Sequence, residues 1–173
     1  MKRCKVLIAP HNDDEALFTA YTIMREKPLV VIVFDGYQHQ RKFGVKITTR
    51  QNESLKAMDL LDIDVVFLHL SDEGTTEEEL AKVLSQFSGR IYAPALGANP
   101  QHNLVSKVCD KLFKYVTHYC TYDKELLQKG KTEIVPTKAE MKLKNKILKC
   151  YKSQLKINPH HFDAVKNKSE YQD

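Results

Sequence analysis

The sequence predicts an α/β fold: one doubly wound, Rossmann-like domain with a mainly parallel sheet of about five strands and flanking helices. Two observations predict it. Short, β-branched or aromatic apolar runs alternate along the chain with amphipathic stretches. The runs are almost continuously apolar, as strands are when a parallel sheet is covered on both faces. The length of 173 residues fits a single domain over residues 1–173.

Each expected element has a local signal. The strands are expected over 4–10, 29–35, 64–70, 90–96 and 115–122. The helices between them are expected over 14–26, about 48–61, 76–87 and 102–113. The third has the clearest start, because Thr76 precedes Glu79 by three residues in a capping-box pattern. A last helix is expected over about 137–156, and the tail after about 165 is expected to be frayed.

Composition indicates an ordinary soluble globular protein, with 42% hydrophobic and 28% charged residues. The longest apolar run, PLVVIVF, has the length of a strand, so no membrane span is expected. The four cysteines are widely spaced and form no CxxC pair. This spacing favours reduced thiols over disulfides or a thiolate zinc site, and we therefore expect a cytoplasmic location.

The net charge of +5 comes entirely from the C-terminal part, since residues 123–173 carry 12 basic and 7 acidic side chains. One interpretation is a patch that binds nucleic acid or another polyanion. The other is a lysine-rich, solvated helix face. The second is favoured because this part contains no arginine, and nucleic acid is not expected as a partner.

Two polar, histidine-bearing loops are expected at one edge of the sheet. A doubly wound sheet binds its ligand at the carboxyl ends of the strands, where the winding direction reverses. With the common strand order 3-2-1-4-5, the first and fourth strands flank that crevice. They are followed by PHNDDE (10–15) and GANPQHN (97–103), so these loops are expected to face each other.

The residues of these loops can form a metal site. His11 and Asp14 lie on one loop and His102 on the other. Two imidazoles and a carboxylate that leave one position open are a recognised catalytic zinc set, and Asp13 could then accept a proton from bound water. In the alternative, the acids favour the positive end of the first helix and His102 caps a later one. Residue types and spacing leave both interpretations open.

Several motifs resemble one family. APHNDDEALF (9–18) resembles the AHPDDE signature of the LmbE-like/PIG-L family of zinc-dependent N-acetylglucosamine de-N-acetylases. Other segments resemble further family motifs in the same order: RQNESLKAMDLLDID (50–64), LSDEG (70–74), NPQHNLV (99–105) and KNKILKCYKSQ (144–154). The resemblance covers most of the chain.

The resemblance implies a role for each matching residue. It makes His11, Asp14 and His102 the ligands of one Zn²⁺ per chain, with another divalent metal possible, and Asp13 the general base. It also implies that Arg50 and Asp72 contact the sugar and are the substrate-binding residues. For Arg50, the alternative is a plain ion pair with Glu53 along the helix.

One departure from the family pattern concerns the proton for the leaving amine. Asn99 stands where the family usually has a histidine that assists at the developing oxyanion. An asparagine can donate a hydrogen bond there but cannot deliver a proton. The proton could come from Asp13, or from a histidine that folds into the site: His118, His160 or His161.

The function that the resemblance implies is metal-dependent removal of the N-acetyl group from an N-acetylglucosamine-type sugar or glycoconjugate. The expected partner is therefore a small-molecule N-acetylated sugar. The alternative is a catalytically impaired member of the family, or a module whose basic tail binds nucleic acid or another polyanion. Asn99 in place of a histidine would agree with impaired catalysis.

Overall fold

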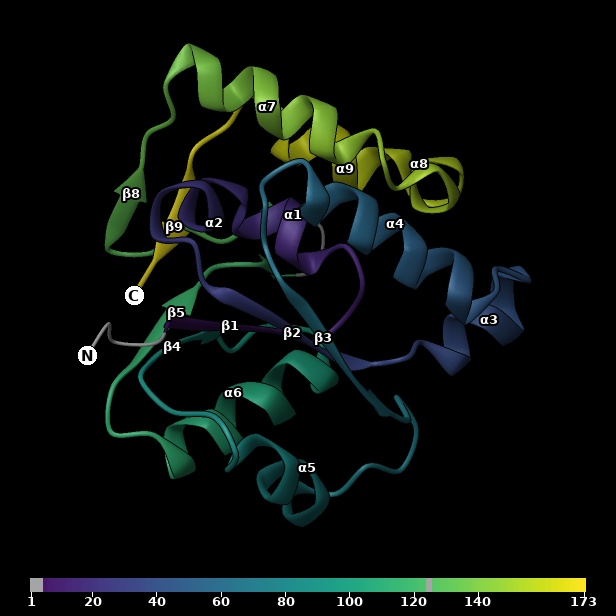
Figure 1. Ribbon diagram of the computed structural model, residues 1–173, viewed down its shortest axis with the longest axis vertical. Helices are drawn as coiled ribbons and strands as arrows, with labels where there is room; N and C mark the ends of the chain where they lie inside the picture. Colours follow the sequence, from purple (N-terminus) through teal and green to yellow (C-terminus); the bar gives the residue numbers. More distant parts are fainter. Residues whose placement is uncertain (1–4, 124–125) are drawn as a thin grey trace.

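The computed structural model describes residues 5–123 and 126–173 and has a central sheet with helices on both faces (Figure 1). The parallel strands are β1 (Lys5–Ala9), β2 (Leu29–Phe34), β3 (Val65–Leu70), β4 (Arg90–Pro94) and β5 (Val116–Tyr119). Their order is β3-β2-β1-β4-β5, which is the doubly wound order expected from the sequence. The carboxyl ends of β1 and β4 are therefore neighbours.

The sheet continues beyond β5 with two strands that were not expected. β9 (Glu170–Gln172) pairs antiparallel with β5, and β8 (Thr132–Ile134) pairs antiparallel with β9. The sheet is thus mixed and has seven strands, where we predicted a mainly parallel sheet of about five. A separate two-stranded sheet joins β6 (Tyr122–Asp123) to β7 (Leu126–Leu127). Strands of two or three residues are too short to show the apolar run or alternation from which strands are predicted.

Apolar side chains on each face of the sheet are covered by a different set of helices. One face packs against α5 (Glu77–Leu84) and α6 (Pro100–Leu112). The other packs against α1 (Asp14–Phe18), α2 (Ala20–Glu26), α4 (Ile47–Asp59), α7 (Lys138–Leu148) and α9 (Pro159–Val165). The short helix α3 (Tyr37–Phe43) follows β2. The capping box predicted at Thr76 is present at the start of α5.

The helix expected over 137–156 is interrupted. It consists of α7 and α8 (Lys152–Ile157), with the break around Tyr151. The Tyr151 side chain is fully buried, and its hydroxyl donates to Oε1 of Glu15 at 2.6 Å. The apolar spacing over 137–156 predicts one helix. The buried contact of Tyr151 with Glu15 lies at the point where this helix is interrupted.

The tail after 165 is ordered, contrary to the expectation that it frays. Glu170 in β9 is 4% exposed, and its carboxylate accepts hydrogen bonds from the backbone amides of Tyr21 and Thr22 at the start of α2. The expected helix over 14–26 breaks at Thr19 into α1 and α2. Glu170 therefore stabilises the new helix start that this break creates.

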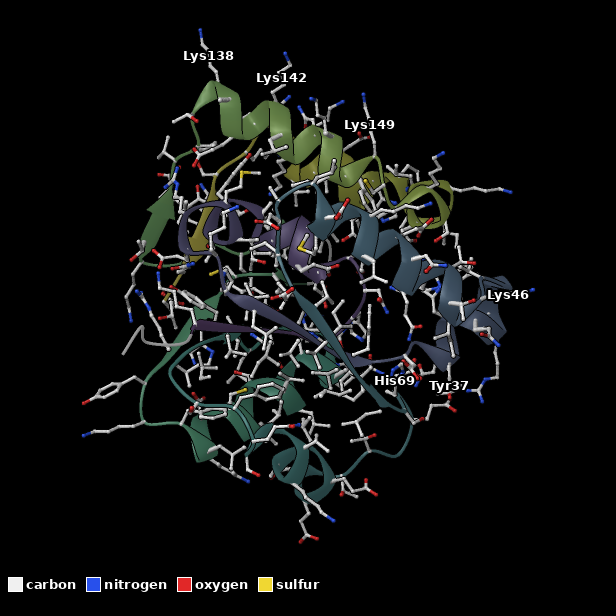
Figure 2. All side chains as sticks on the ribbon, in the orientation of Figure 1. Tyr37, Lys46, His69, Lys138, Lys142 and Lys149 are labelled. Atoms are coloured by element: carbon white, nitrogen blue, oxygen red, sulfur yellow. The ribbon has the colours of Figure 1, made fainter. Side chains whose placement is uncertain are left out.

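Three lysines in or beside α7 are consistent with the solvated-face interpretation of the charge pattern, whereas Lys144 of the same helix is buried. Lys138, Lys142 and Lys149 project away from the body of the molecule, the last of them just after the helix ends (Figure 2). Among the described residues, none of the helices combines the length and apolar character that crossing a membrane requires.

Candidate metal centre and active site

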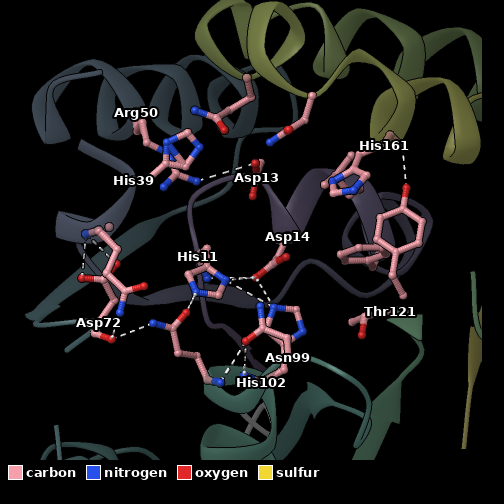
Figure 3. Close-up of a pocket in the computed structure, with 18 of the residues that line it drawn as sticks. His11, Asp13, Asp14, His39, Arg50, Asp72, Asn99, His102, Thr121 and His161 are labelled. Carbon is pink, nitrogen blue, oxygen red and sulfur yellow. Dashed lines mark hydrogen bonds and ion pairs between the residues drawn. The ribbon is translucent and has the colours of Figure 1, made fainter. Parts of the chain in front are cut away.

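A cavity of about 470 Å³ lies at the carboxyl ends of the central strands, where the switch in winding predicts a ligand site. All seven residues that the sequence singled out for the site line it (Figure 3): His11, Asp13, Asp14, Arg50, Asp72, Asn99 and His102. The segment that joins β1 to α1 and the start of α6 supply five of them. The two histidine-bearing loops therefore face each other as expected.

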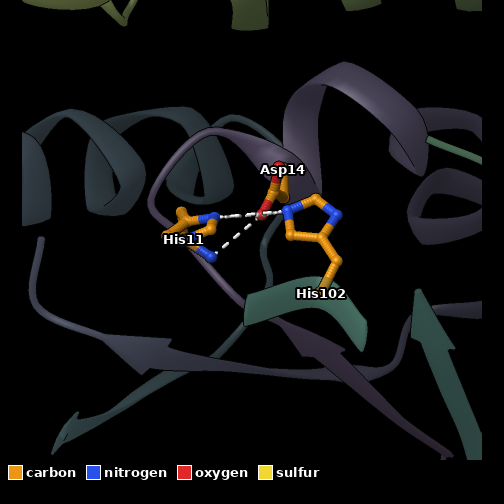
Figure 4. A group of neighbouring side chains, drawn as sticks. All are labelled: His11, Asp14 and His102. Carbon is orange, nitrogen blue, oxygen red and sulfur yellow. Dashed lines mark hydrogen bonds and ion pairs between the residues drawn. The ribbon is translucent and has the colours of Figure 1, made fainter. Parts of the chain in front are cut away.

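Three of these side chains converge on one point (Figure 4). Oδ2 of Asp14 lies 3.1 Å from Nδ1 of His11 and 3.1 Å from Nε2 of His102. The two nitrogens are themselves 3.2 Å apart. Three atoms at such equal spacing cannot all be hydrogen-bonded to one another, because each ring nitrogen carries at most one proton. A shared cation would satisfy all three.

The spacing of the three atoms fits a small tetrahedral metal ion. Ligand distances of about 2.0–2.1 Å place the ligands of tetrahedral zinc about 3.3–3.4 Å apart, close to the separations found here. The chemistry of the donors also fits, since imidazole and carboxylate groups are common zinc ligands. His11, Asp14 and His102 are thus able to hold a metal.

The surroundings of Asp14 keep it ionised. Burial alone would raise the pKa of its carboxyl group, but the charge and hydrogen bonds of His102 and His11 outweigh burial. The pKa therefore lies well below its usual range. The backbone amide of His11 also donates to Oδ2 at 2.9 Å. An anionic carboxylate is the form that binds a metal ion.

Asp13 lies beside this cluster but contributes no atom to it. Its backbone has φ of 116°, an unusual conformation for a residue with a side chain, and its amide donates to Glu15. Burial raises the pKa of Asp13 to about 8, while Arg50, 3.6 Å from its carboxylate, acts in the opposite direction. The side chain retains 15% exposure and lines the cavity. Such a carboxyl group is placed for proton transfer.

Arg50 packs against the first loop and does not pair with Glu53. Its Nη2 donates to the carbonyl oxygen of Asn12 at 2.6 Å, while Glu53 accepts hydrogen bonds from Ser153. Nε of Arg50 is buried and has no hydrogen-bond partner among the described residues. Gly36 makes room for the guanidinium group, since a Cβ at that position would lie 2.6 Å from Nη1.

Asp72 lines the cavity and holds neighbouring segments in place through its hydrogen bonds. Its carboxylate accepts from the backbone amide of Gln38 at 3.1 Å, near the start of α3. Its carbonyl oxygen accepts from the side-chain nitrogens of Gln38 and Gln101. Asp72 therefore lines the cavity and also fixes the position of α3.

Asn99 is the N-cap of α6. Its Oδ1 accepts from the backbone amides of Gln101 at 2.9 Å and His102 at 3.4 Å. This cap orients the carboxamide and leaves its nitrogen as the group that can donate to a ligand in the cavity.

Some residues that line the cavity were not identified from the sequence. Burial lowers the pKa of His39 to about 4, and the positive charges of Arg50 and His11 act in the same direction. Nδ1 of His39 is buried without a partner in the described part of the chain. Gln101 contacts His11, and its only sequence signal was its place beside His102 in NPQH.

The three histidines considered as proton donors have different positions. His161 lines the cavity, and its carbonyl oxygen accepts from the hydroxyl of Tyr122 at 2.5 Å. His160 packs against the ring of His161 but does not line the cavity. His118 lies elsewhere, with Nε2 2.9 Å from Asp110. Of the three, the structure brings only His161 to the site.

Comparison with known proteins adds a family to this geometry. The model of the PIG-L family, described as GlcNAc-PI de-N-acetylase, matches residues 6–113. No curated protein sequence matches the chain significantly.

Several solved structures share the fold. A conserved protein from Thermus thermophilus superposes with a TM-score of 0.75 and 17% identity, over 98% of this chain and 93% of that chain. The A40926 pseudoaglycone deacetylase Dbv21 superposes with a TM-score of 0.73 and 14% identity, over 99% of this chain and 96% of that chain. The 4-carboxy-2-hydroxymuconate hydratase GalB from Pseudomonas putida superposes with a TM-score of 0.74 and 13% identity, over 99% of this chain and 95% of that chain. Because a deacetylase and a hydratase both appear, the fold alone does not decide the reaction.

Proposed function

We propose that this chain, which belongs to the PIG-L family of GlcNAc-PI de-N-acetylases, is a metal-dependent hydrolase that removes an N-acetyl group from an N-acetylglucosamine-type sugar or glycoconjugate. The observation that carries the proposal is the triangle formed by His11, Asp14 and His102 inside a cavity that also contains Asp13. In the reaction, water adds to the amide carbonyl, the C–N bond breaks, and acetate and a free amine leave.

His11, Asp14 and His102 would hold the metal, most simply one Zn²⁺ per chain. When bound, such an ion polarises a carbonyl oxygen and makes a water molecule more acidic. The three side chains come from two segments of the chain and line the cavity, so a substrate can approach the cluster from the cavity side. This is the arrangement of catalytic sites, in contrast to structural sites in which four protein ligands enclose the metal.

Asp13 is the proposed general base. It is adjacent in sequence to the ligand Asp14 and lines the same cavity, but none of its atoms belongs to the triangle. The Asp13 carboxylate faces Arg50, whereas that of Asp14 faces the two histidines (Figure 3). Asp13 can therefore take the proton of the attacking water without leaving a ligand position. A cation in the triangle would favour its ionised form, because opposite charges lower the pKa of a carboxyl group.

Asn99 would stabilise the oxyanion of the tetrahedral intermediate through its side-chain nitrogen, since its oxygen is engaged in capping α6. The proton for the leaving amine would come from Asp13, which gained one in the first step. His161, which lines the cavity from α9, is the second group that could supply it.

Arg50 and Asp72 would contact the sugar. Both line the cavity, and Arg50 has a buried Nε that lacks a partner among the described residues. A planar guanidinium group suits the hydroxyl oxygens of a sugar, and a carboxylate accepts hydrogen bonds from hydroxyl groups.

The direct experiment combines metal analysis with acetate release from a panel of N-acetylated sugars and glycoconjugates. Protein prepared without chelator should contain close to one divalent metal per chain. Acetate release should stop when a chelator removes the metal and return when zinc is added. His102→Ala should lose both metal and activity. Folded, metal-free protein whose acetate release does not respond to zinc would contradict the proposal.

A further inference from the structure

We propose that Gln101 is a positioning residue that holds His11 in the tautomer whose Nδ1 is free to bind a metal, and so increases the metal affinity of the centre. The inference rests on the proposed function, because it assigns a role to Gln101 at the same metal site.

The orientation of the Gln101 side chain is fixed by a contact on its far side. Its Nε2 donates to the carbonyl oxygen of Asp72 at 2.7 Å. A reversed carboxamide would place two acceptor oxygens against each other there. The oxygen Oε1 must therefore be the atom that faces His11, 2.5 Å from its Nε2.

This orientation decides which nitrogen of His11 carries the proton. A carboxamide oxygen only accepts hydrogen bonds, so Nε2 of His11 must be the donor. The form of histidine that binds a metal is the neutral imidazole, which has one N–H, so with Nε2 protonated Nδ1 keeps its lone pair for the ion. Nδ1 is the His11 atom in the triangle with Asp14 and His102. The hydrogen bond to Gln101 thus selects the ligand form and the ring orientation together.

The second histidine ligand has no corresponding support. Nδ1 of His102 is buried and has no hydrogen-bond partner among the described residues. His102 is instead held by its place in the first turn of α6, a helix of 13 residues capped by Asn99. His11 lies on the loop between β1 and α1, outside any helix or strand. The ligand on the less regular element is the one with a side-chain acceptor.

Gln101 also joins three separate segments. It belongs to α6, accepts from the loop after β1 and donates to the loop after β3. The carbonyl oxygen of Asp72 is held in turn by Nε2 of Gln38. Replacing Gln101 should therefore affect the position and tautomer of His11 first, because Nε2 of His11 is hydrogen-bonded to the glutamine oxygen.

The test measures zinc affinity by competition with a chromogenic chelator for three proteins: the unchanged chain, Gln101→Leu and Gln101→Glu. Loss of such an outer hydrogen bond typically weakens metal binding by about 10–100-fold, which is the effect expected for Gln101→Leu. Gln101→Glu retains an acceptor for Nε2–H but loses the donor to the carbonyl oxygen of Asp72, so its affinity should fall by less than that of Gln101→Leu. Gln51→Leu is the matched control, because Gln51 contacts Asp35 and His69 and none of the ligands.

Equal zinc affinity in Gln101→Leu and the unchanged chain would overturn the inference. An equal loss in the leucine and glutamate variants would also overturn it, because an acceptor for Nε2–H would then make no difference to metal binding. An unchanged chain that binds no zinc would instead contradict the proposed function. A second readout needs no variant: nitrogen-15 spectra of the zinc-loaded protein should show the His11 proton on Nε2. A proton on Nδ1 would overturn the inference even if Gln101→Leu fails to fold.

Discussion

Nζ of Lys144 lies 2.8 Å from Oε1 of Glu170, and both side chains are at most 2% exposed. Lys144 also donates to the carbonyl oxygen of Leu17 near the end of α1, while Glu170 accepts from the first amides of α2. The ion pair therefore stabilises the end of α1 and the start of α2, the two helices that meet at Thr19. Since Leu17 lines the cavity and α1 begins at Asp14, this buried pair stabilises the helix that carries Asp14.

Removing one partner of this pair should be strongly destabilising. Lys144→Met leaves the Glu170 carboxylate buried without its counter-charge, a change that typically costs about 3–5 kcal/mol. Adding Glu170→Gln to that variant removes the unpaired charge and keeps an acceptor for the amide of Tyr21, so part of the stability should return. Urea denaturation of the two single variants and the double variant measures this. A double variant whose losses simply add would mean that the two groups do not act as a pair.

Substitutions of Asp13 and Asp14 should impair the protein in different ways, one through turnover and the other through metal binding. Asp14→Asn replaces an anionic ligand by a neutral one, so metal affinity should fall and activity should return partly with excess metal. Asp13→Asn keeps the three ligands but removes the proton acceptor, so metal should stay bound while kcat falls by about 10²–10⁴-fold. Metal content measured beside kcat separates the two. If Asp13→Asn loses the metal and Asp14→Asn keeps it, the roles are exchanged.

Arg50→Ala should mainly raise KM, because a sugar contact made equally in the ground and transition states is lost. Gly36→Ala should produce a similar change, since the new Cβ would lie 2.6 Å from Nη1 of Arg50. Gly44→Ala is its control: Gly44 has a comparable φ of 71°, but nothing lies within 4 Å of the added Cβ. A fall in kcat at unchanged KM in Arg50→Ala would mean that Arg50 acts on the transition state.

Stability in acid should depend on Glu140. Its hydrogen bonds to Arg25 lower the pKa of Glu140 to about 2, from 4.5. Because the folded pKa lies below the unfolded one, the stabilisation is fully present above about pH 4.5 and is lost as the pH falls toward 2. Glu140→Gln should therefore cost about 1 kcal/mol at pH 7, and the difference from the unchanged chain should shrink between pH 4.5 and 2.

The measurement for Glu140 is thermal unfolding over about pH 2–7, the range that spans its folded and unfolded pKa values. Glu78→Gln serves as control, because Glu78 also lies in the first turn of a helix but has no side-chain partner in the described part of the chain. A stability difference for Glu140→Gln that stays constant over this pH range would show that the ion pair with Arg25 contributes nothing.

The parallel half of the fold was predictable mainly from β1, β2 and β4, because strands buried on both faces have almost continuously apolar sequences. β3 and β5 are only partly buried, but their β-branched and aromatic residues still indicate strands. The doubly wound order then brings the loops of His11 and His102 together. Their convergence follows from topology and needs no knowledge of side-chain detail.

The features that the sequence did not predict depend on contacts between distant residues. β9 is short and polar, and it is held by pairing with its neighbours and by the buried carboxylate of Glu170. The break before α8 comes from the contact of Tyr151 with Glu15. Gln101 is an ordinary polar residue in its helix, and only the positions of Asp72 and His11 reveal its hydrogen bonds. None of these has a local periodicity or turn signal.

The hydrogen bond between Glu170 and the amide of Tyr21 joins residues separated by 149 positions in the chain. Closing so large a loop costs conformational entropy that only later contacts offset, and such pairings tend to form slowly. Strands β1 and β2 can pair long before β9 is in place, whereas the support behind Asp14 cannot form until then. In refolding, we therefore expect most secondary structure to recover first, and the capacity to bind metal to follow in a slower kinetic phase.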